Sequence, residues 1–498
     1  MKKRILLIAF TTVVFVAFNN FSTVSSGQNA DSSDALFTIR ETPQFKSQKS
    51  SIAAKRESEI EFVRRNPREN DRETLSLTLF DGKNYAAKRT STEARAADDF
   101  TWRGKIIEGK IENDVVLTFK NGYVSGLIYA ANAVYEIVVR GEQQILVEID
   151  QNKYPECAGD VKGVENESEP SALLNKTTTA ASVDSGDRID VLVVYTAAVK
   201  TSLGGEAQAQ TFAQQAIDST NTTYINSKIR QRVRLAGAVE TTLAESGTLS
   251  GELSTVRADP AVAALREQYK ADLVAMISNS TDNCGIGYLL GSGNSLNGFT
   301  VNSRTCAVGN LSFAHELGHN MGSTHNPENG SAPSYSYGYG HYVNGVFRTV
   351  MSYTDPCTMG CARRPYFSNP EVLFGGLPTG IENARDNARS INNTADRIAN
   401  YRYSGANLAL ENFNGGDALP RNIKRTVNWS SENIAGNVKI ELSRDGGTTW
   451  KTLAADTPND GAETIVINGN ATRRARLRIS SVSNPMYSDS SVQNVLIR

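Results

Sequence analysis

The sequence has few of the residues that bind metals or carry redox chemistry: 4 histidines, 5 cysteines and 6 methionines among 498 residues. It also lacks a charge excess. Its 52 lysines and arginines face 53 aspartates and glutamates, which gives a net charge of −1 and no basic field for nucleic acid or an anionic membrane. No stretch other than the short run Ile5–Phe18 is apolar enough to suggest a membrane crossing. Because histidine is scarce, the presence of three of the four within His315–His325 is informative.

The segment His315–His325 has the spacing of a metal site. His315 and His319 are four residues apart, so on a helix they project from one face. Glu316 lies at the edge of that face, where a carboxylate takes a proton from zinc-bound water. Gly322 can end the helix in the left-handed conformation and return His325 to the metal as a third ligand. The segment predicts a zinc site with one open position; an amphipathic helix with solvent-facing histidines is the alternative for H-E-x-x-H alone.

A second motif lies downstream. Met351 is in Thr349–Tyr353, and H-E-x-x-H-x-x-G-x-x-H followed by such a Met-turn is the signature of metzincins. The chain resembles these zinc peptidases, and the resemblance implies that Met351 forms a hydrophobic floor under the metal without binding it. Tyr353 has the spacing at which astacins and serralysins place a tyrosine near zinc, so we expect its hydroxyl near the metal or the oxyanion. Packing of Tyr353 in the core is the alternative.

The N-terminus has the pattern of a secretory signal peptide at residues 1–26. Lys2-Lys3-Arg4 precedes the apolar run Ile5–Phe18, and small residues follow up to Ser26. We therefore expect a secreted protein that has no membrane association after cleavage; a retained anchor is the alternative. Secretion permits disulfides. The simplest pairing of four cysteines is Cys284–Cys306 with Cys357–Cys361, although four cysteines allow three pairings. Cys157 is left over.

Residues 27–160 are expected to form a propeptide with a β domain. Little order is expected at its start, and Glu73 to Asp150 shows alternating strands with turn signals, the strongest being Asn121-Gly122. A polar linker accessible to proteases should follow at 161–186. Cys157 precedes this linker and can place its thiolate on the open position of zinc. The segment loosely resembles the cysteine switches of matrix metalloproteinases and adamalysins. It differs from them at Glu156 and Ala158, and an exposed or intermolecularly paired cysteine is the alternative.

Residues 187–403 are expected to be the catalytic domain. The apolar run Ile189–Tyr195 predicts a buried strand, and the alternation of strands and helices after it predicts a sheet covered by helices. Asn310 or Ser312 is expected to cap the helix of the histidine motif. The glycine-bounded strand 285–291 is expected at a sheet edge, where Gly287, Tyr288 and Leu289 could pair with an extended substrate; an ordinary hairpin arm is the alternative.

Residues 404–498 change character again. They contain short strands, aspartate–glycine turns and two tryptophans, but no cysteine or histidine. The spacing predicts an all-β sandwich that resembles the immunoglobulin-like modules of secreted bacterial enzymes. Such a domain would bind a surface or polymer, or act as a spacer.

From Ile189 to about Tyr403 the chain is similar to bacterial reprolysin-like (adamalysin-type) metallopeptidases. The resemblance implies that His315, His319 and His325 bind zinc and that Glu316 is the general base. Reprolysins usually have aspartate after the third histidine, whereas this chain has Asn326.

The stretch Phe313–Phe367 is also similar to peptidyl-Asp metalloendopeptidases, which cleave on the N-terminal side of aspartate. Such a site needs a fixed cation, and Arg348, Arg363 and Arg364 are candidates; surface arginines are the alternative.

The expected protein is multidomain, with a β-rich propeptide, an α/β (α+β) metzincin zinc-peptidase domain and a C-terminal all-β immunoglobulin-like sandwich. The expected function is a secreted endopeptidase that hydrolyses peptide bonds through a Glu-activated zinc-bound water and is made as a latent zymogen. A non-enzymatic adhesin on a peptidase scaffold is the alternative. The expected cofactor is Zn²⁺, structural Ca²⁺ is not indicated, and the expected partners are protein or peptide substrates rather than nucleic acid.

Overall fold

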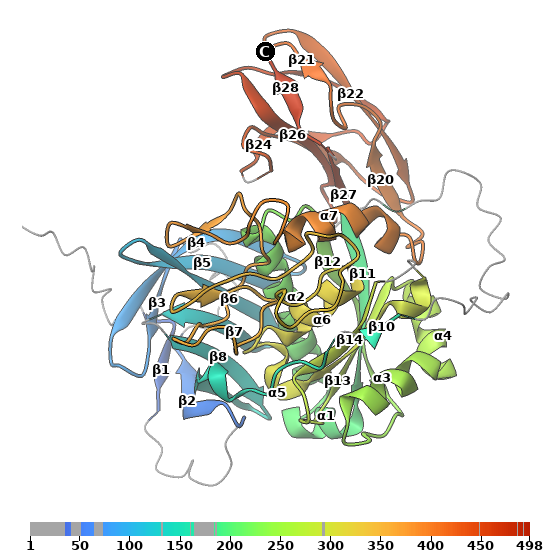
Figure 1. Cartoon of the computed structure of the whole chain (residues 1–498). Helices are drawn as coiled ribbons and strands as arrows, with labels where there is room; N and C mark the ends of the chain where they lie inside the picture. The colour runs from blue at the N-terminus through green and yellow to red at the C-terminus, as the bar shows by residue number, and fades with distance from the viewer. Residues whose placement is uncertain are drawn as a thin grey trace, which may run out of the picture.

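The computed structural model describes residues 35–40, 51–63, 73–130, 133–159, 161–163, 184, 187–290, 294–447, 449–485, 487–491 and 493–498. The expected signal peptide and most of the expected linker lie outside these residues. Figure 1 distinguishes three parts: an N-terminal sheet in blue to cyan, a central sheet with helices in green to orange, and C-terminal strands in red. Among the described residues no helix is both long and apolar enough to cross a membrane.

The N-terminal sheet is antiparallel, with nine strands in the order β1-β2-β9-β8-β7-β6-β5-β4-β3. Its β6–β7 hairpin turns at Asn121-Gly122, which have φ of 54° and 78°, as the Asn-Gly pair predicted. The Leu36 amide donates to the Ser76 carbonyl (2.8 Å), so the two ends of the sheet meet around a core that contains Trp102. The strands are β1 (Phe37–Ile39), β2 (Ala54–Phe62), β3 (Thr74–Thr78), β4 (Asn84–Ala94), β5 (Phe100–Glu108), β6 (Ile111–Lys120), β7 (Tyr123–Ala130), β8 (Ala133–Arg140) and β9 (Gln143–Ile149).

Strands β1 and β2 correct the expectation of little order near the start of this region. In β2 the apolar Ala54, Ile60 and Phe62 are buried, while most of the charged residues between them are wholly or partly exposed. A charge-rich strand is stable here because its backbone pairs with β9 and only part of its surface needs to be apolar. The expectation of little order came from the high content of charged residues in this region.

The central sheet has six strands in the order β10-β14-β15-β13-β11-β12. β11, β12, β13 and β15 are parallel, and β14 is antiparallel to β15. All nine residues of β11 are buried, which agrees with the apolar run predicted to start this region. The strands are β10 (Val161–Lys162), β11 (Arg188–Thr196), β12 (Arg232–Thr241), β13 (Leu273–Ser278), β14 (Gly285–Leu289) and β15 (Phe299–Ser303).

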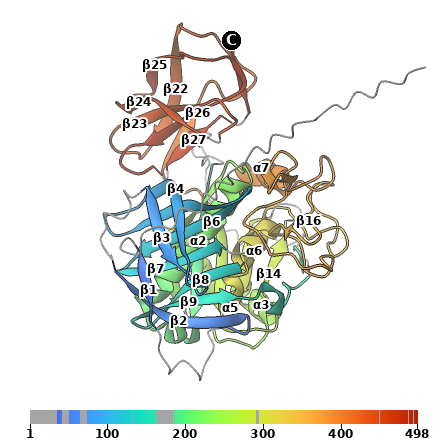
Figure 2. The same cartoon turned by 90° about the vertical axis from the view of Figure 1, so that its left-hand side faces the viewer.

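Among the described residues, seven α-helices belong to this part of the chain. They are α1 (Ala197–Leu203), α2 (Glu206–Asn226), α3 (Leu249–Ala258), α4 (Pro260–Tyr269), α5 (Arg304–Ala307), α6 (Ser312–Asn320) and α7 (Asn387–Ile398). Helix α2 packs against β6 of the N-terminal sheet and β12 of the central sheet, between the two parts (Figures 1 and 2). The remaining short elements are η3 (Gln151–Lys153), η4 (Ser295–Asn297), β16 (Tyr342–Val343), β17 (Phe347–Arg348), β18 (Leu373–Phe374) and β19 (Leu377–Pro378).

The C-terminal strands form two sheets around one core, which includes Val427 and Trp429 from one sheet and Ile440 and Leu477 from the other. They meet the central part where Tyr487 lies under the guanidinium of Arg188. The strands are β20 (Asn407–Leu410), β21 (Ala418–Leu419), β22 (Lys424–Glu432), β23 (Val438–Ser443), β24 (Lys451–Thr457), β25 (Ala462–Val466), β26 (Thr472–Ser481), β27 (Ser488–Ser490) and β28 (Val495–Ile497).

Candidate active site

Helix α6 carries the histidine motif, and every one of its residues is buried. Neither Asn310 nor Ser312 caps it, which corrects the expected cap: the helix is preceded by Leu311 in a left-handed conformation (φ 55°) without a side-chain cap. The C-terminal end follows the sequence prediction. Gly322 has φ of 81°, and the Ser323 amide donates to the Gly318 carbonyl (3.0 Å), which reverses the chain toward His325.

The three imidazoles of this motif converge. Nε2 of His315, His319 and His325 are 3.1 Å from one another in each pair. Nδ1 of His315 lies 2.8 Å from the Val350 carbonyl, and Nδ1 of His319 lies 3.0 Å from the Ser323 carbonyl. Because a carbonyl only accepts, both Nδ1 atoms carry the proton and both Nε2 atoms present lone pairs to the common centre.

This geometry fits a metal ion. Tetrahedral metal–nitrogen bonds of about 2.0–2.1 Å require nitrogens about 3.3 Å apart, close to the separation here. Burial, with His319 and His325 next in effect, lowers the pKa of His315 well below its usual value, so the imidazole is neutral, as a ligand must be. Carbonyls that fix the tautomer of ligating histidines are the usual outer partners of such a site.

Glu316 lies on α6 beside this centre and faces strand β14. Its carboxylate packs against the backbone of Gly285, where an added Cβ would clash with it, and the Glu316 carbonyl would be 3.1 Å from a Cβ at Gly287. The two glycines of β14 therefore allow the strand to approach the helix closely. Asn320 holds the same contact by donating to the Tyr288 carbonyl (2.8 Å).

The turn at Met351 packs against α6 and contacts the histidine motif. Met351 is fully buried, and a Cβ at Gly318 would lie 2.7 Å from its sulfur, so a larger residue at this position of α6 would have to displace the Met351 side chain. The neighbouring Val350 supplies the carbonyl that orients His315. Met351 therefore packs against α6 at Gly318, between the positions of His315 and His319 in the chain.

Asn326 joins the third histidine to this turn. Its side-chain oxygen accepts from the Tyr353 amide (2.9 Å), and its nitrogen donates to Glu328 (2.9 Å). An aspartate would accept the same Tyr353 bond, so the departure from the reprolysin pattern leaves the connection intact. The Tyr353 ring lies against His325, with ring centroids 4.1 Å apart.

Cys157 reaches the metal-binding centre from the N-terminal part of the chain. Its sulfur, a nitrogen of His315 and an oxygen of Glu316 lie within 4.8 Å of one another, and the residue is buried at 4% exposure. Burial, followed by the charge of Glu316, raises the thiol's pKa well above its usual value. A bound divalent cation would supply the positive charge that a thiolate needs here.

Residues 154–159 and 161–163, which we call the crossing segment, run along β14. The Ala158 amide donates to the Gly285 carbonyl (2.8 Å), and β10 then pairs in parallel with β14, with Val161 opposite Tyr288. The Tyr353 hydroxyl donates to the Cys157 carbonyl (2.7 Å). The edge strand predicted to receive an extended peptide is thus paired with the chain's own segment. Val161 and Lys162, the first residues of the expected linker, form this strand.

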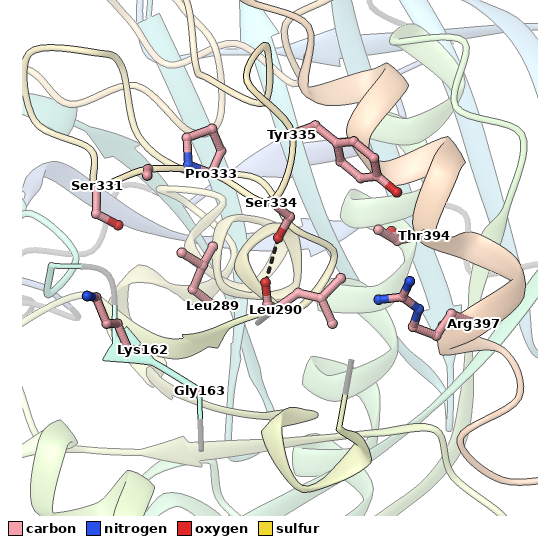
Figure 3. A pocket seen from close by; sticks show the side chains of 11 residues that line it. Lys162, Gly163, Leu289, Leu290, Ser331, Pro333, Ser334, Tyr335, Thr394 and Arg397 are labelled. Atoms are coloured by element: carbon pink, nitrogen blue, oxygen red, sulfur yellow. Dashed lines mark hydrogen bonds between the residues drawn. The ribbon is translucent and has the colours of Figure 1, made fainter. Parts of the chain in front are cut away.

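A pocket of about 570 Å³ opens where the crossing segment leaves β14. Figure 3 shows Leu289 and Leu290 at its centre, with Lys162 on one side and Arg397 of α7 on the other. The Ser334 hydroxyl donates to the Leu290 carbonyl (2.5 Å) and so links the loop that contains Ser334 to the end of β14. Leu289, the last residue of β14 and one of the residues expected to contact substrate, lines this pocket.

The three candidate arginines lie in different surroundings. Arg348 is buried and donates to the Ser352 carbonyl (2.8 Å), and Arg363, also buried, donates to the Asn310 carbonyl (2.9 Å). Arg364 instead faces Asn113 of the N-terminal sheet (3.2 Å). All three are buried, so the alternative of surface arginines is wrong. Sequence reasoning missed that Glu156 faces Arg363, although its position next to Cys157 was a signal.

The other cysteines pair as expected, and the fourth histidine lies outside the cluster. The structure contains the disulfides Cys284–Cys306 and Cys357–Cys361, and Cys157 is the remaining free cysteine. Because Cys157 is buried, the alternative of an exposed thiol is wrong. His341, the fourth histidine, lies apart from the three ligands, 3.4 Å from Arg385.

Comparison with known proteins places this site in a family. Residues 185–368 match the model of metallopeptidase family M12. The chain is 31% identical over 303 residues to a peptidyl-Asp metalloendopeptidase of Stenotrophomonas maltophilia (strain R551-3), across 58% of this chain and 71% of that protein. The chain belongs to metallopeptidase family M12. The matched residues include all three histidines, Glu316 and Met351.

Two further relatives extend the similarity of this M12 peptidase. A peptidyl-Asp metalloendopeptidase of S. maltophilia (strain K279a) is 30% identical over 64% of this chain and 81% of its own length. Another, from Xanthomonas campestris pv. campestris, is 29% identical over 66% of this chain and 82% of its own length. The chain is thus a metalloendopeptidase, which confirms the predicted enzyme class, and the adhesin alternative is not favoured.

Proposed function

We propose that this protein is a secreted zinc endopeptidase, synthesised in a latent form and selective for peptide bonds before aspartate. The observation that carries the proposal is the convergence of three buried imidazole nitrogens 3.1 Å apart beside a buried glutamate. Secretion is supported by the two disulfides and by the signal-peptide pattern. Aspartate selectivity is suggested by relatives that are named peptidyl-Asp metalloendopeptidases.

His315, His319 and His325 would hold the metal through Nε2. When bound, zinc acts as a Lewis acid that activates water and polarises the scissile carbonyl. Glu316 accepts a proton from the attacking water and delivers it to the leaving amine. Its buried position against β14 supports this role, because a peptide paired with β14 would bring its carbonyl within reach of the same carboxylate.

Latency is supported by the crossing segment, which pairs with β14 and places Cys157 beside His315 and Glu316. A thiolate there would fill the fourth ligand position. The N-terminal sheet covers α2 through polar contacts: Arg95 pairs with Asp218 (3.2 Å), and Arg103 donates to Thr222 (2.9 Å). Because this face of α2 is polar, it can be exposed to water after the N-terminal part is removed. Removal of a propeptide requires such a face.

Hydrolysis of azocasein tests the proposed function. After cleavage within residues 161–186, the protein should degrade azocasein, and o-phenanthroline should abolish the activity. Zinc added in excess of the chelator should restore it, because removal of the metal leaves the histidines in place. Absence of hydrolysis by the cleaved, zinc-loaded protein would contradict the proposal.

Replacing Tyr353 with phenylalanine should lower kcat by about 10- to 100-fold with little change in KM, since a hydroxyl that stabilises the oxyanion acts mainly in the transition state. The Tyr353 hydroxyl already donates to a carbonyl of the crossing segment, at the place where a substrate carbonyl would lie. Steady-state kinetics on one peptide measure the effect. An unchanged kcat would mean that Tyr353 only packs against His325.

The C-terminal strands are proposed to form an accessory domain that binds a surface or polymer, or serves as a spacer. They enclose a core of their own and contribute no residue to the histidine cluster.

A further inference from the structure

Two buried arginines lie side by side near the crossing segment, with little to balance their charge. Arg348 and Arg363 are 1% and 0% exposed, and both donate to the Ser352 carbonyl, at 2.8 and 3.3 Å. Burial and the nearby Arg363 lower the pKa of Arg348 to about 9. Two guanidinium groups held this close in a protein interior are unfavourable without an anion.

Glu156 of the crossing segment supplies that anion. Among the described residues it is the only carboxylate that forms an ion pair with Arg363, with Nη2 and Oε2 3.9 Å apart. Its other oxygen accepts from the Thr354 amide (2.7 Å). The carboxylate is thus held by one buried cation and one backbone N–H, an arrangement that recognises an acidic side chain.

Glu156 is also the immediate neighbour of Cys157, whose sulfur lies at the metal-binding histidines. The Cys284 amide donates to the Glu156 carbonyl (3.2 Å), so Glu156 lies at the Gly285 end of β14. The crossing segment runs parallel to β14. A substrate paired antiparallel to β14 would place the residue after its scissile bond at this same end.

We propose that Arg363 and the Thr354 amide form the pocket for the acidic side chain of the substrate, and that Glu156 fills this pocket as a substrate mimic in the intact chain. The inference rests on the proposed function and identifies its specificity-determining residue. Removal of the crossing segment leaves the buried cations without their carboxylate, and an aspartate side chain after the scissile bond restores the charge balance. Arg348 donates to the same carbonyl as Arg363 and strengthens the positive field.

The first arm of the test measures the intact, zinc-loaded chain by a readout other than proteolysis. Cys157 is the only cysteine outside the disulfides, so its modification rate by a neutral thiol reagent reports how often the crossing segment leaves the cleft. Glu156→Gln should raise that rate by about 10- to 100-fold. Arg363→Gln should do the same, and the double variant should exceed neither single variant, because both break one interaction.

Arg364→Gln is the matched control, since this neighbouring arginine faces Asn113 rather than the cleft, and it should leave the rate unchanged. Should Arg363→Gln fail to fold, Glu156→Gln and Arg363→Lys carry the test, with Arg363→Lys between wild type and Glu156→Gln. An unchanged rate in Glu156→Gln, or additive effects in the double variant, would overturn the substrate-mimic role.

The second arm measures substrate selectivity after cleavage of the linker. Two peptides that differ only by aspartate or asparagine after the scissile bond are compared by kcat/KM. Wild type should prefer aspartate by about 100-fold, Arg363→Gln should bring the ratio close to one, and Arg364→Gln should retain it. A wild-type enzyme without preference would overturn the aspartate selectivity of the proposed function, whereas a preference that persists in Arg363→Gln would overturn the assignment of Arg363.

Discussion

Glu316→Ala is expected to keep the bound zinc and lose nearly all turnover, by about 10³-fold or more. The three metal ligands are the converging Nε2 atoms of the histidines, and Glu316 lies beside them without being a ligand. Its removal therefore leaves the ligand set complete. What is lost is the carboxylate that moves the proton from water to the leaving amine. Metal content by mass spectrometry and azocasein hydrolysis by the cleaved protein measure the two effects separately.

His319→Ala is the matched control for this prediction. It removes one of the three converging nitrogens, so metal content and turnover should fall together. Retention of appreciable proteolysis by Glu316→Ala in a metal-replete assay would show that another group is the base.

Cys157→Ser in the intact chain should raise proteolytic activity by about 10-fold or more without cleavage of the linker. The thiol lies within 4.8 Å of His315 and Glu316, and a soft thiolate binds zinc better than the hydroxyl that replaces it. Its connection to the catalytic part through the chain raises its effective concentration at the metal. Treatment of the wild-type chain with a mercurial should have the same effect, and azocasein hydrolysis measures both.

Equal latency in Cys157→Ser would assign inhibition to steric cover instead. The crossing segment would still pair with β14, and the N-terminal sheet would still cover α2. Activity would then appear only after cleavage of the linker, regardless of the residue at position 157.

The histidine motif could be predicted from sequence because its geometry is local. The spacing of His315 and His319 on one helix and the turn at Gly322 depend on neighbouring residues, and the structure has the helix and the turn. The strand Ile189–Tyr195 was predictable for a similar reason, since a parallel strand covered on both faces needs a continuous apolar run.

Contacts between distant segments could not be predicted. Glu156 and Arg363 are more than 200 positions apart, and nothing in either neighbourhood shows that their charges meet. Helix α2 is largely polar yet buried, because Asp218 and Thr222 face charged partners on the N-terminal sheet. The cap of α6 was mispredicted, because the residue before the helix is the buried, left-handed Leu311 and no side chain caps it.

X-ray absorption at the zinc edge of the intact chain counts the atoms bound to the metal and so tests thiolate and histidine binding together. We expect three nitrogen ligands at about 2.0–2.1 Å and one sulfur at about 2.3 Å, with the sulfur replaced by oxygen after cleavage of the linker and in Cys157→Ser. A spectrum of the intact chain with only nitrogen and oxygen ligands would contradict thiolate binding, and one with fewer than three nitrogens would contradict the histidine site itself.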